Sequence, residues 1–227
     1  WPPTSSLYPA AARSPSRYTT ARKEGDLVEI LSGVFEGKTT GTPISLMVRN
    51  TDQRSRDYGN IAYSYRPGHA DYTFDQKYGF RDYRGGGRSS GRETIGRVAA
   101  GAIASKILEE LGISICTYTK SIGPVEITTF DKEEINNNAF YMPDALAAAK
   151  AGEYLEECMK NQDSAGGVIE CRISGTPAGL GDPVFDKLNA VLAHALMSIG
   201  AVKAVEVGDG IAVTSLKGST DNDGFTV

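Results

Sequence analysis

Apolar residues recur at helical spacing in several stretches of the chain, and the clearest stretch follows Gly91. Seven of them fall on one helical face, and Gly112 stands where helices commonly end in a left-handed residue. Ser90 followed by Glu93 forms a capping box, which predicts that this helix begins at about Gly91. The apolar face consists of Ile95, Val98, Ala99, Ala102, Ile103, Ile107 and Leu111.

Two further helices are predicted downstream. Pro183 after Asp182 suits a first helical turn, because proline lacks an amide hydrogen that the first turn leaves unpaired, and Gly200 ends this helix. Asp144 can cap another helix that runs through Met159, but its apolar face is weak, so we expect it to be peripheral. The buried side of the helix after Pro183 consists of Val184, Leu188, Val191, Leu192, Ala195, Leu196 and Ile199.

Short apolar stretches bounded by glycine and polar residues predict strands between these helices. Arg49–Tyr65 is expected to be a polar loop and Phe130–Asn138 a surface insertion. The order of elements predicts an α+β fold in layers, with helices against antiparallel sheets rather than alternating βαβ units. The expected strands are a hairpin of Leu27–Leu31 with Ile44–Val48, a strand between Gly112 and Pro124, a strand at Gly166–Ile173, and Ala201–Val207 with Ile211–Leu216 around a Gly-Asp-Gly turn.

Composition narrows the class of protein. The 227 residues are 40% hydrophobic and 23% charged, which is typical of a globular protein with one sizeable core. A net charge of -4 argues against a general nucleic-acid binder, which needs a broad basic surface. Three cysteines without a close pair and two histidines make a structural metal site improbable and fit a reducing cytoplasm. No apolar run reaches about 18 residues, so no membrane span is expected.

The charge is distributed unevenly along the chain. From Arg49 to Arg97 there are nine arginines and one lysine against six acidic residues. Arginine binds carboxylate and phosphate through two parallel hydrogen bonds, which lysine cannot do. This stretch therefore predicts a binding site for a small anion with several negative charges.

The start of the predicted helix after Gly91 is the first candidate for that site. Three glycines, Gly85–Gly87, leave the backbone bare before Arg88 and Ser89, and free amides at a helix start attract phosphate. An ordinary capped helix after a flexible surface loop explains the same residues equally well.

His69 is the candidate for proton transfer. It lies in the sequence Pro-Gly-His-Ala-Asp, where a turn is expected and Asp71 can orient the imidazole ring. The alternative is a loop histidine that only bonds to the backbone. His194 lies on a predicted helix off the main apolar face, and we expect it to be a surface histidine. No nucleophile motif supports hydrolase chemistry.

Seven long motifs run in register from about Ser16 to the last residue. They are SRYTT (16–20), LSGVFEGKTTGTPI (31–44), NTDQRSRDY (50–58), RPGHADYT (66–73), RDYRGGGRSSGRET (81–94), SGTPAGLGDPVFD (174–186) and ALMSIGAVKAVEVGDG (195–210). Together these motifs resemble chorismate synthase. The resemblance implies a β-α-β sandwich, assembled as a homotetramer. It also implies an anti-1,4-elimination that converts 5-enolpyruvylshikimate 3-phosphate to chorismate and phosphate with reduced FMN, NADPH serving only to reduce the flavin.

The resemblance also assigns roles to residues that match the family's motifs. His69 matches an active-site histidine thought to protonate or hydrogen-bond the reduced flavin. The positions that match FMN contacts are Arg88, Ser89, Ser90, Gly200 and Ala201, and Gly200 stands where asparagine is frequent in the family. Arg17 matches an arginine of the family's substrate or nucleotide pocket, and Arg66 is a further candidate for binding the substrate through a phosphate or a carboxylate.

The sequence departs from the family pattern at both ends. Residues 1–15 do not match, the family's N-terminal histidine motif and its later flavin and Arg-His-Asp-Pro-Cys motifs are not found, and residues 16–227 are interpreted as one incomplete domain. We therefore expect a central portion of the enzyme that is inactive by itself. Two alternatives stay open: a non-catalytic module that binds FMN or a phosphate ligand, and an RNA-binding protein that uses the arginines with Tyr63, Tyr65, Tyr72, Tyr78 and Tyr83.

Overall fold

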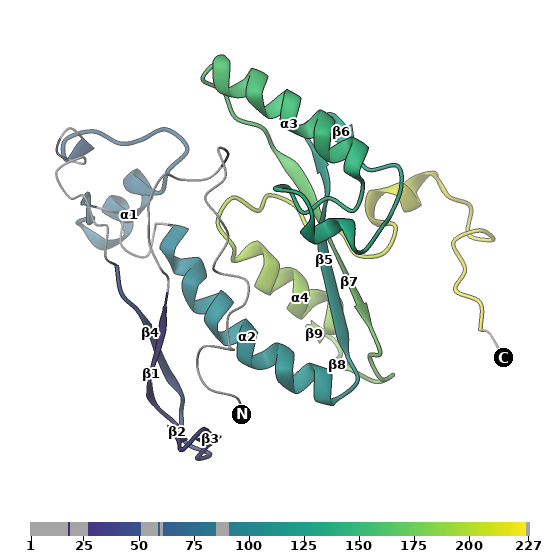
Figure 1. Cartoon of the computed structure of the whole chain (residues 1–227), viewed down its shortest axis with the longest axis horizontal. Coiled ribbons are helices and arrows are strands. Elements are labelled where there is room, and N and C mark those ends of the chain that lie inside the picture. Colours follow the sequence, from purple (N-terminus) through teal and green to yellow (C-terminus); the bar gives the residue numbers. More distant parts are fainter. Residues whose placement is uncertain (1–17, 19–26, 51–58, 60, 85–90, 226–227) are drawn as a thin grey trace. The chain divides into compact units, whose positions relative to one another are not determined.

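Figure 1 shows the helices and strands of the chain in a computed structural model. The chain divides into two compact units. The first consists of Trp1–Asp52 and Ala99–Thr176, and the second consists of Gln53–Val98 and Pro177–Val227. The structure describes residues 18, 27–50, 59, 61–84 and 91–225. Within these residues, no helix has both the length and the apolar content needed to cross a membrane.

The predicted N-terminal hairpin is confirmed in the first unit. β1 (Val28–Ser32) pairs antiparallel with β4 (Ser45–Val48). Their connection holds a second small hairpin of β2 (Val34–Phe35) and β3 (Lys38–Thr39), which the sequence did not predict because two-residue strands show no alternation. Gly33 precedes β2 at φ +82°, where a Cβ would lie 2.8 Å from the Ile44 side chain, so only glycine fits.

The predicted helix after Gly91 is confirmed and leads into a three-stranded sheet. A 3₁₀ turn at Gly91–Glu93 precedes α2 (Thr94–Glu110), while Ser90 of the capping box lies outside the described residues. Gly112 at φ +75° ends the helix, and the Ile113 amide donates to the Leu108 carbonyl at 2.9 Å. Of the seven apolar residues on the predicted face, only Ala99 is fully buried.

The sheet of the first unit contains the two strands predicted on either side of the acidic insertion. β5 (Ser114–Ile122) lies between β6 (Val125–Glu126) and β7 (Gly167–Ser174), and both pairings are antiparallel. At the end of β7, Gly175 at φ +80° meets the turn after α2, where a Cβ would lie 2.1 Å from the Gly112 carbonyl oxygen. The close approach of these two chain segments therefore depends on a glycine.

The helix α3 (Ala145–Lys160) begins directly after its predicted cap and ends one residue beyond the predicted Met159, but the expectation that it is peripheral was wrong. Three of its alanines form a buried cluster of the first unit together with Met142, and apolar residues from the end of β5 onward pack against this cluster. Alanines give only a weak signal in the pattern of apolar residues along a helix, yet their small side chains allow the helix to lie close to a sheet. The cluster contains Met142, Ala147, Ala148 and Ala151, with Ile122, Val125, Ile127 and Phe140 against it.

Asp144 caps α3 and also fixes the segment before it. Its carboxylate accepts hydrogen bonds from the backbone amides of Ala147, Thr128 and Thr129 and from the Thr128 hydroxyl, at 2.9–3.1 Å. The hydrogen bond from the Ala147 amide, followed by those from Thr128, lowers the pKa of this buried carboxyl well below its ordinary value. The expected surface insertion at Phe130–Asn138 is likewise partly packed, because Ile135 is buried.

The second unit differs most from the sequence predictions. α1 (Asp71–Tyr78) was not predicted at all. The helix expected from Pro183 begins later, as α4 (Leu188–Met197), because β8 (Gly181–Asp182) pairs with β9 (Asp186–Lys187) just before it. The two strands expected around the Gly-Asp-Gly turn were wrong: 201–207 has no regular structure, and Gly210–Ser215 is a 3₁₀ helix.

The α+β class itself is confirmed, since every strand pairing in the described residues is antiparallel and helices occur in both units.

Candidate functional site

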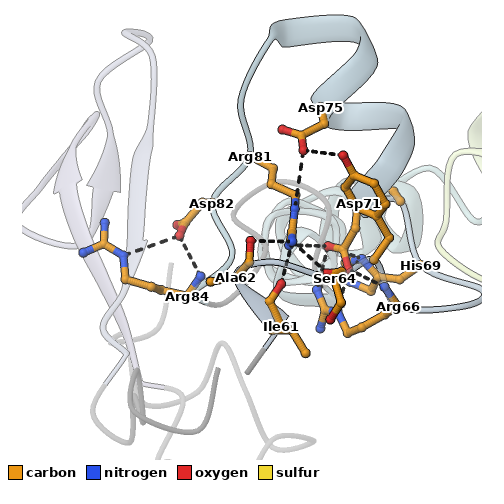
Figure 2. A network of polar contacts seen from close by, with 12 residues as sticks. Ile61, Ala62, Ser64, Arg66, His69, Asp71, Asp75, Arg81, Asp82 and Arg84 are labelled. Atoms are coloured by element: carbon orange, nitrogen blue, oxygen red, sulfur yellow. Dashed lines mark hydrogen bonds and ion pairs between the residues drawn. The ribbon is translucent and has the colours of Figure 1, made fainter. Parts of the chain in front are cut away.

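A cluster of charged residues surrounds the start of α1 in the second unit (Figure 2). Arg66, Pro67 and Gly68 form a turn, in which Gly68 lies at φ +69° and the His69 amide donates to the Arg66 carbonyl at 3.3 Å. This turn brings residues 66, 69 and 71 to one side of the chain. We call Arg66, His69, Asp71, Asp75 and Arg81 the charged cluster.

Asp71 is the buried centre of the charged cluster, with 2% of its surface exposed. The Arg66 guanidinium donates to it through Nε at 2.8 Å and Nη2 at 3.0 Å, and the Arg66 backbone amide donates at 3.1 Å. The hydrogen bonds from the Arg66 guanidinium hold the pKa of the Asp71 carboxyl well below its ordinary value. Asp71 is therefore a fixed negative charge at any pH near neutrality.

His69 contacts this fixed charge directly. Its Nδ1 lies 3.0 Å from Oδ1 of Asp71 and 3.2 Å from Nη2 of Arg66, and its side chain is 24% exposed. The contact between His69 and Asp71 that the sequence predicted is present. A half-buried imidazole with one nitrogen held by a carboxylate can exchange a proton through its other nitrogen.

Arg81 closes the charged cluster from the other side and was missed by the sequence analysis. Its side chain is 7% exposed, and Nη2 donates to the backbone carbonyls of Ile61, Ser64 and Ala62 at 2.5, 2.8 and 3.2 Å. Nη1 lies 3.5 Å from Oδ1 of Asp71. Figure 2 marks the contacts of Arg81 with dashed lines. Arg81 thereby connects the loop before His69 to Asp71.

Asp75 extends the cluster one turn along α1. It accepts a hydrogen bond from the Tyr65 hydroxyl at 2.9 Å and lies 3.7 Å from Nε of Arg81. The Arg81 guanidinium also lies 5.3 Å from the centre of the Tyr65 ring, and Tyr65 packs edge-on against Tyr72. These contacts hold the loop and the helix together as one structure.

The structure describes only some of the residues that the sequence analysis singled out. Arg17, Arg88, Ser89 and Ser90 lie outside the described residues. Arg66 is engaged by Asp71 and His69, so its guanidinium already has protein partners.

Gly200 and Ala201 lie in the exposed turn after α4, and Ala201 adopts φ +70°. A Cβ at Gly200 would meet no atom of the described residues within 4 Å, so this part of the chain leaves the backbone there open to approach. Arg97 of α2 donates to the Ser198 carbonyl at 3.0 Å and to its hydroxyl at 3.1 Å. This contact joins the first turn of α2 to the end of α4, the helix that precedes Gly200.

His194 is an exposed residue of α4, as the sequence predicted. It is the second of only two histidines in the chain.

The sequence contained no signal for the burial of Arg81, which depends on the loop of residues 61–64 folding back over it.

Comparison with known proteins decides the family. A family model described as chorismate synthase matches residues 9–227. The chain belongs to the chorismate synthase family. Chorismate synthase of Agathobacter rectalis is 66% identical over 212 residues, which cover 92% of this chain and 58% of that protein. Chorismate synthase of Lachnoclostridium phytofermentans is 65% identical over the same length and share.

A solved structure that is less similar in sequence than these relatives has a similar fold. A crystal structure of chorismate synthase shares 33% sequence identity and a TM-score of 0.73, and covers 88% of this chain and 60% of that one. The chain thus spans less than two thirds of the length of the chorismate synthases it matches.

Proposed function

We propose that this chain is the part of a chorismate synthase that carries the proton-exchanging histidine and much of the anion-binding surface. The reaction converts 5-enolpyruvylshikimate 3-phosphate to chorismate and phosphate. The observation that carries the proposal is the 66% identity to the Agathobacter rectalis chorismate synthase over 92% of the chain. The charged cluster supports it, because His69 is held beside a fixed carboxylate in an arginine-rich loop.

The residues of this chain supply binding and proton transfer. The substrate carries a phosphate and two carboxylates, which suits the arginine-rich stretch 49–97. His69 holds or accepts a proton near the reacting groups, and Asp71 and Arg66 fix its ring. Arg17 and Arg66 are proposed to contribute to the substrate pocket.

Reduced FMN is the proposed cofactor, and NADPH is needed only for its reduction. The open backbone at Gly200 and Ala201 is compatible with close approach of a flavin. Arg88, Ser89 and Ser90 would hold its phosphate together with the helix start that follows them. Reduced FMN bound there would supply a transient electron to an elimination that has no net redox change.

The longer chorismate synthases are the basis for two further proposals. The whole protein is proposed to be a homotetramer that acts in the cytoplasm, where three free cysteines are compatible with a reducing environment. The chain made alone is proposed to be inactive. Val98 and Ile107 of the expected buried face of α2 are 57% and 52% exposed, and the relatives are longer than this chain, which supports this proposal.

The proposal is tested by a chimera in which this chain replaces the 212 matched residues of the Agathobacter rectalis chorismate synthase. Incubated anaerobically with reduced FMN and 5-enolpyruvylshikimate 3-phosphate, the chimera should form chorismate, and the 227-residue chain should not. A correctly folded chimera that binds both ligands without forming chorismate would refute the catalytic assignment and favour a binding module. Tight, salt-sensitive binding of RNA would favour the RNA-binding alternative instead.

A further inference from the structure

The Nδ1 atom of His69 has two neighbours with opposite requirements. Oδ1 of Asp71, at 3.0 Å, can only accept a hydrogen bond, and Nη2 of Arg66, at 3.2 Å, can only donate one. A hydrogen on Nδ1 satisfies the contact with Asp71, whereas a lone pair on Nδ1 satisfies the contact with Arg66. The neutral imidazole can satisfy only one of them, so the neighbours decide which ring nitrogen carries the hydrogen.

The surrounding contacts favour the hydrogen on Nδ1. Nη2 of Arg66 already donates to Oδ1 of Asp71 at 3.0 Å, so it does not depend on the histidine for a partner. A lone pair on Nδ1 would instead face a carboxylate oxygen at 3.0 Å with no hydrogen between them.

The carboxylate cannot turn away to relieve that repulsion. Its other oxygen, Oδ2, accepts from the Arg66 backbone amide and from Nε of Arg66, and Arg81 lies 3.5 Å from Oδ1. Asp71 is 2% exposed, so water does not compete for these contacts. The orientation of the carboxylate is therefore set before any ligand binds.

We propose that Asp71 is a positioning residue that keeps a hydrogen on Nδ1 of His69 and leaves Nε2 as the atom that exchanges a proton with a ligand. Within the described residues, the recorded contacts of the ring involve Nδ1 and leave Nε2 for that exchange. The proposal deepens the proposed function, on which the identity of the ligand rests. The preferred tautomer, however, is a property of the chain itself.

The decisive measurement is the ¹⁵N NMR spectrum of the histidine rings in the 227-residue chain. The chain has only two histidines, so His194→Gln assigns the signals without touching the charged cluster. At a pH where the ring is neutral, His69 should show a protonated Nδ1 and an unprotonated Nε2, opposite to the usual preference of an exposed imidazole, for which His194 is the internal reference. A neutral His69 that carries its hydrogen on Nε2 would overturn the proposal.

Asp71→Asn tests whether the carboxylate causes this preference. Oδ2 keeps two donors from Arg66, so the amide oxygen should take that position and the amide NH₂ should face His69. The neutral ring should then carry its hydrogen on Nε2 in most molecules. The matched control is Asp75→Asn, since Asp75 contacts Tyr65 and Arg81 but not His69, and it should leave the tautomer unchanged.

Three results would contradict the role of Asp71: a wild-type ring with the hydrogen on Nε2, an unchanged tautomer in folded Asp71→Asn, or an equal change in Asp75→Asn. The wild-type spectrum decides the matter if Asp71→Asn fails to fold. None of these measurements uses flavin or substrate. A failure of the chimera to form chorismate would therefore leave the tautomer result standing, and the reverse also holds.

Discussion

Replacing Arg81 with methionine should weaken the loop that presents His69. Arg81 is 7% exposed and donates to three backbone carbonyls of residues 61–64, while pairing with Asp71 and Asp75. Methionine fills similar space but donates no hydrogen bond. The change therefore removes the polar contacts that join this loop to α1 and retains most of the packing.

The expected loss follows from the geometry. Nη2 has two hydrogens for three carbonyls, so it makes at most two full hydrogen bonds, each worth about 1.5–3 kcal/mol when the donor is charged. Nη1 is buried without a hydrogen-bond partner in the described part of the chain, and its removal recovers about 1–3 kcal/mol. With both ranges taken at the same end, the net local destabilisation should be about 2–3 kcal/mol.

Native-state amide hydrogen exchange measures this loss where it occurs. Suitable reporters in α1 are the amides of Phe74 and Gly79, which donate to helical carbonyls at 3.0 and 2.8 Å. Their exchange should accelerate by roughly 30- to 140-fold in Arg81→Met, since about 1.4 kcal/mol corresponds to a factor of ten.

The control for this prediction is Arg84→Met, a nearby arginine that is 65% exposed and pairs with Asp82 at 3.8 Å. An exposed ion pair contributes about 0–1 kcal/mol, so exchange in α1 should stay close to that of the wild type. Equal exchange rates in Arg81→Met, Arg84→Met and the wild type would refute the argument that burial makes Arg81 structurally important.

Three further predictions concern other residues. Hydrogen bonds lower the pKa of Asp144 in the folded chain, so this carboxylate stabilises the fold above about pH 4 and the stabilisation is lost as the pH falls. The free energy of urea unfolding should therefore fall less steeply with acid pH in Asp144→Asn than in the wild type, and equal slopes of free energy against pH would contradict this. Burial raises the pKa of Tyr118 to about 12, so Tyr118→Phe should remove a late step from the ultraviolet titration, and an unchanged curve above pH 11 would contradict the burial argument. Arg88→Ala in the chimera should weaken FMN or substrate binding by about 1.5–3 kcal/mol in titration calorimetry, and unchanged affinities would exclude an anion site there.

The strongly patterned elements were predictable from sequence because their signals are local. The bounds of α2 follow from its apolar spacing and from Gly112, and Asp144 was identified as the cap of α3. The importance of α3 was not predictable, because its buried face consists of alanines whose value depends on the sheet against them. The late start of α4 likewise depends on the pairing of β8 with β9, which competes with the helix signal at Pro183.

The candidate site was predictable only in part, because contacts between residues close in sequence leave a local signal and contacts between distant residues do not. His69 and Asp71 are two positions apart, so the turn at Gly68 sufficed to suggest their contact. Arg81 reaches the cluster only through the folding of α1 and the preceding loop. Its role in the cluster therefore becomes visible only in three dimensions.

The central claim is that His69 takes part in the elimination, and turnover of the chimera with and without this histidine tests it most directly. His69→Ala should lower the rate of chorismate formation by roughly 10²-fold or more, since a positioned acid or base contributes about that much, while the melting temperature stays close to that of the unmodified chimera. His194→Ala, which removes the exposed histidine of α4, should leave the rate near its original value. Retained turnover in His69→Ala, or an equal loss in both variants, would contradict the account.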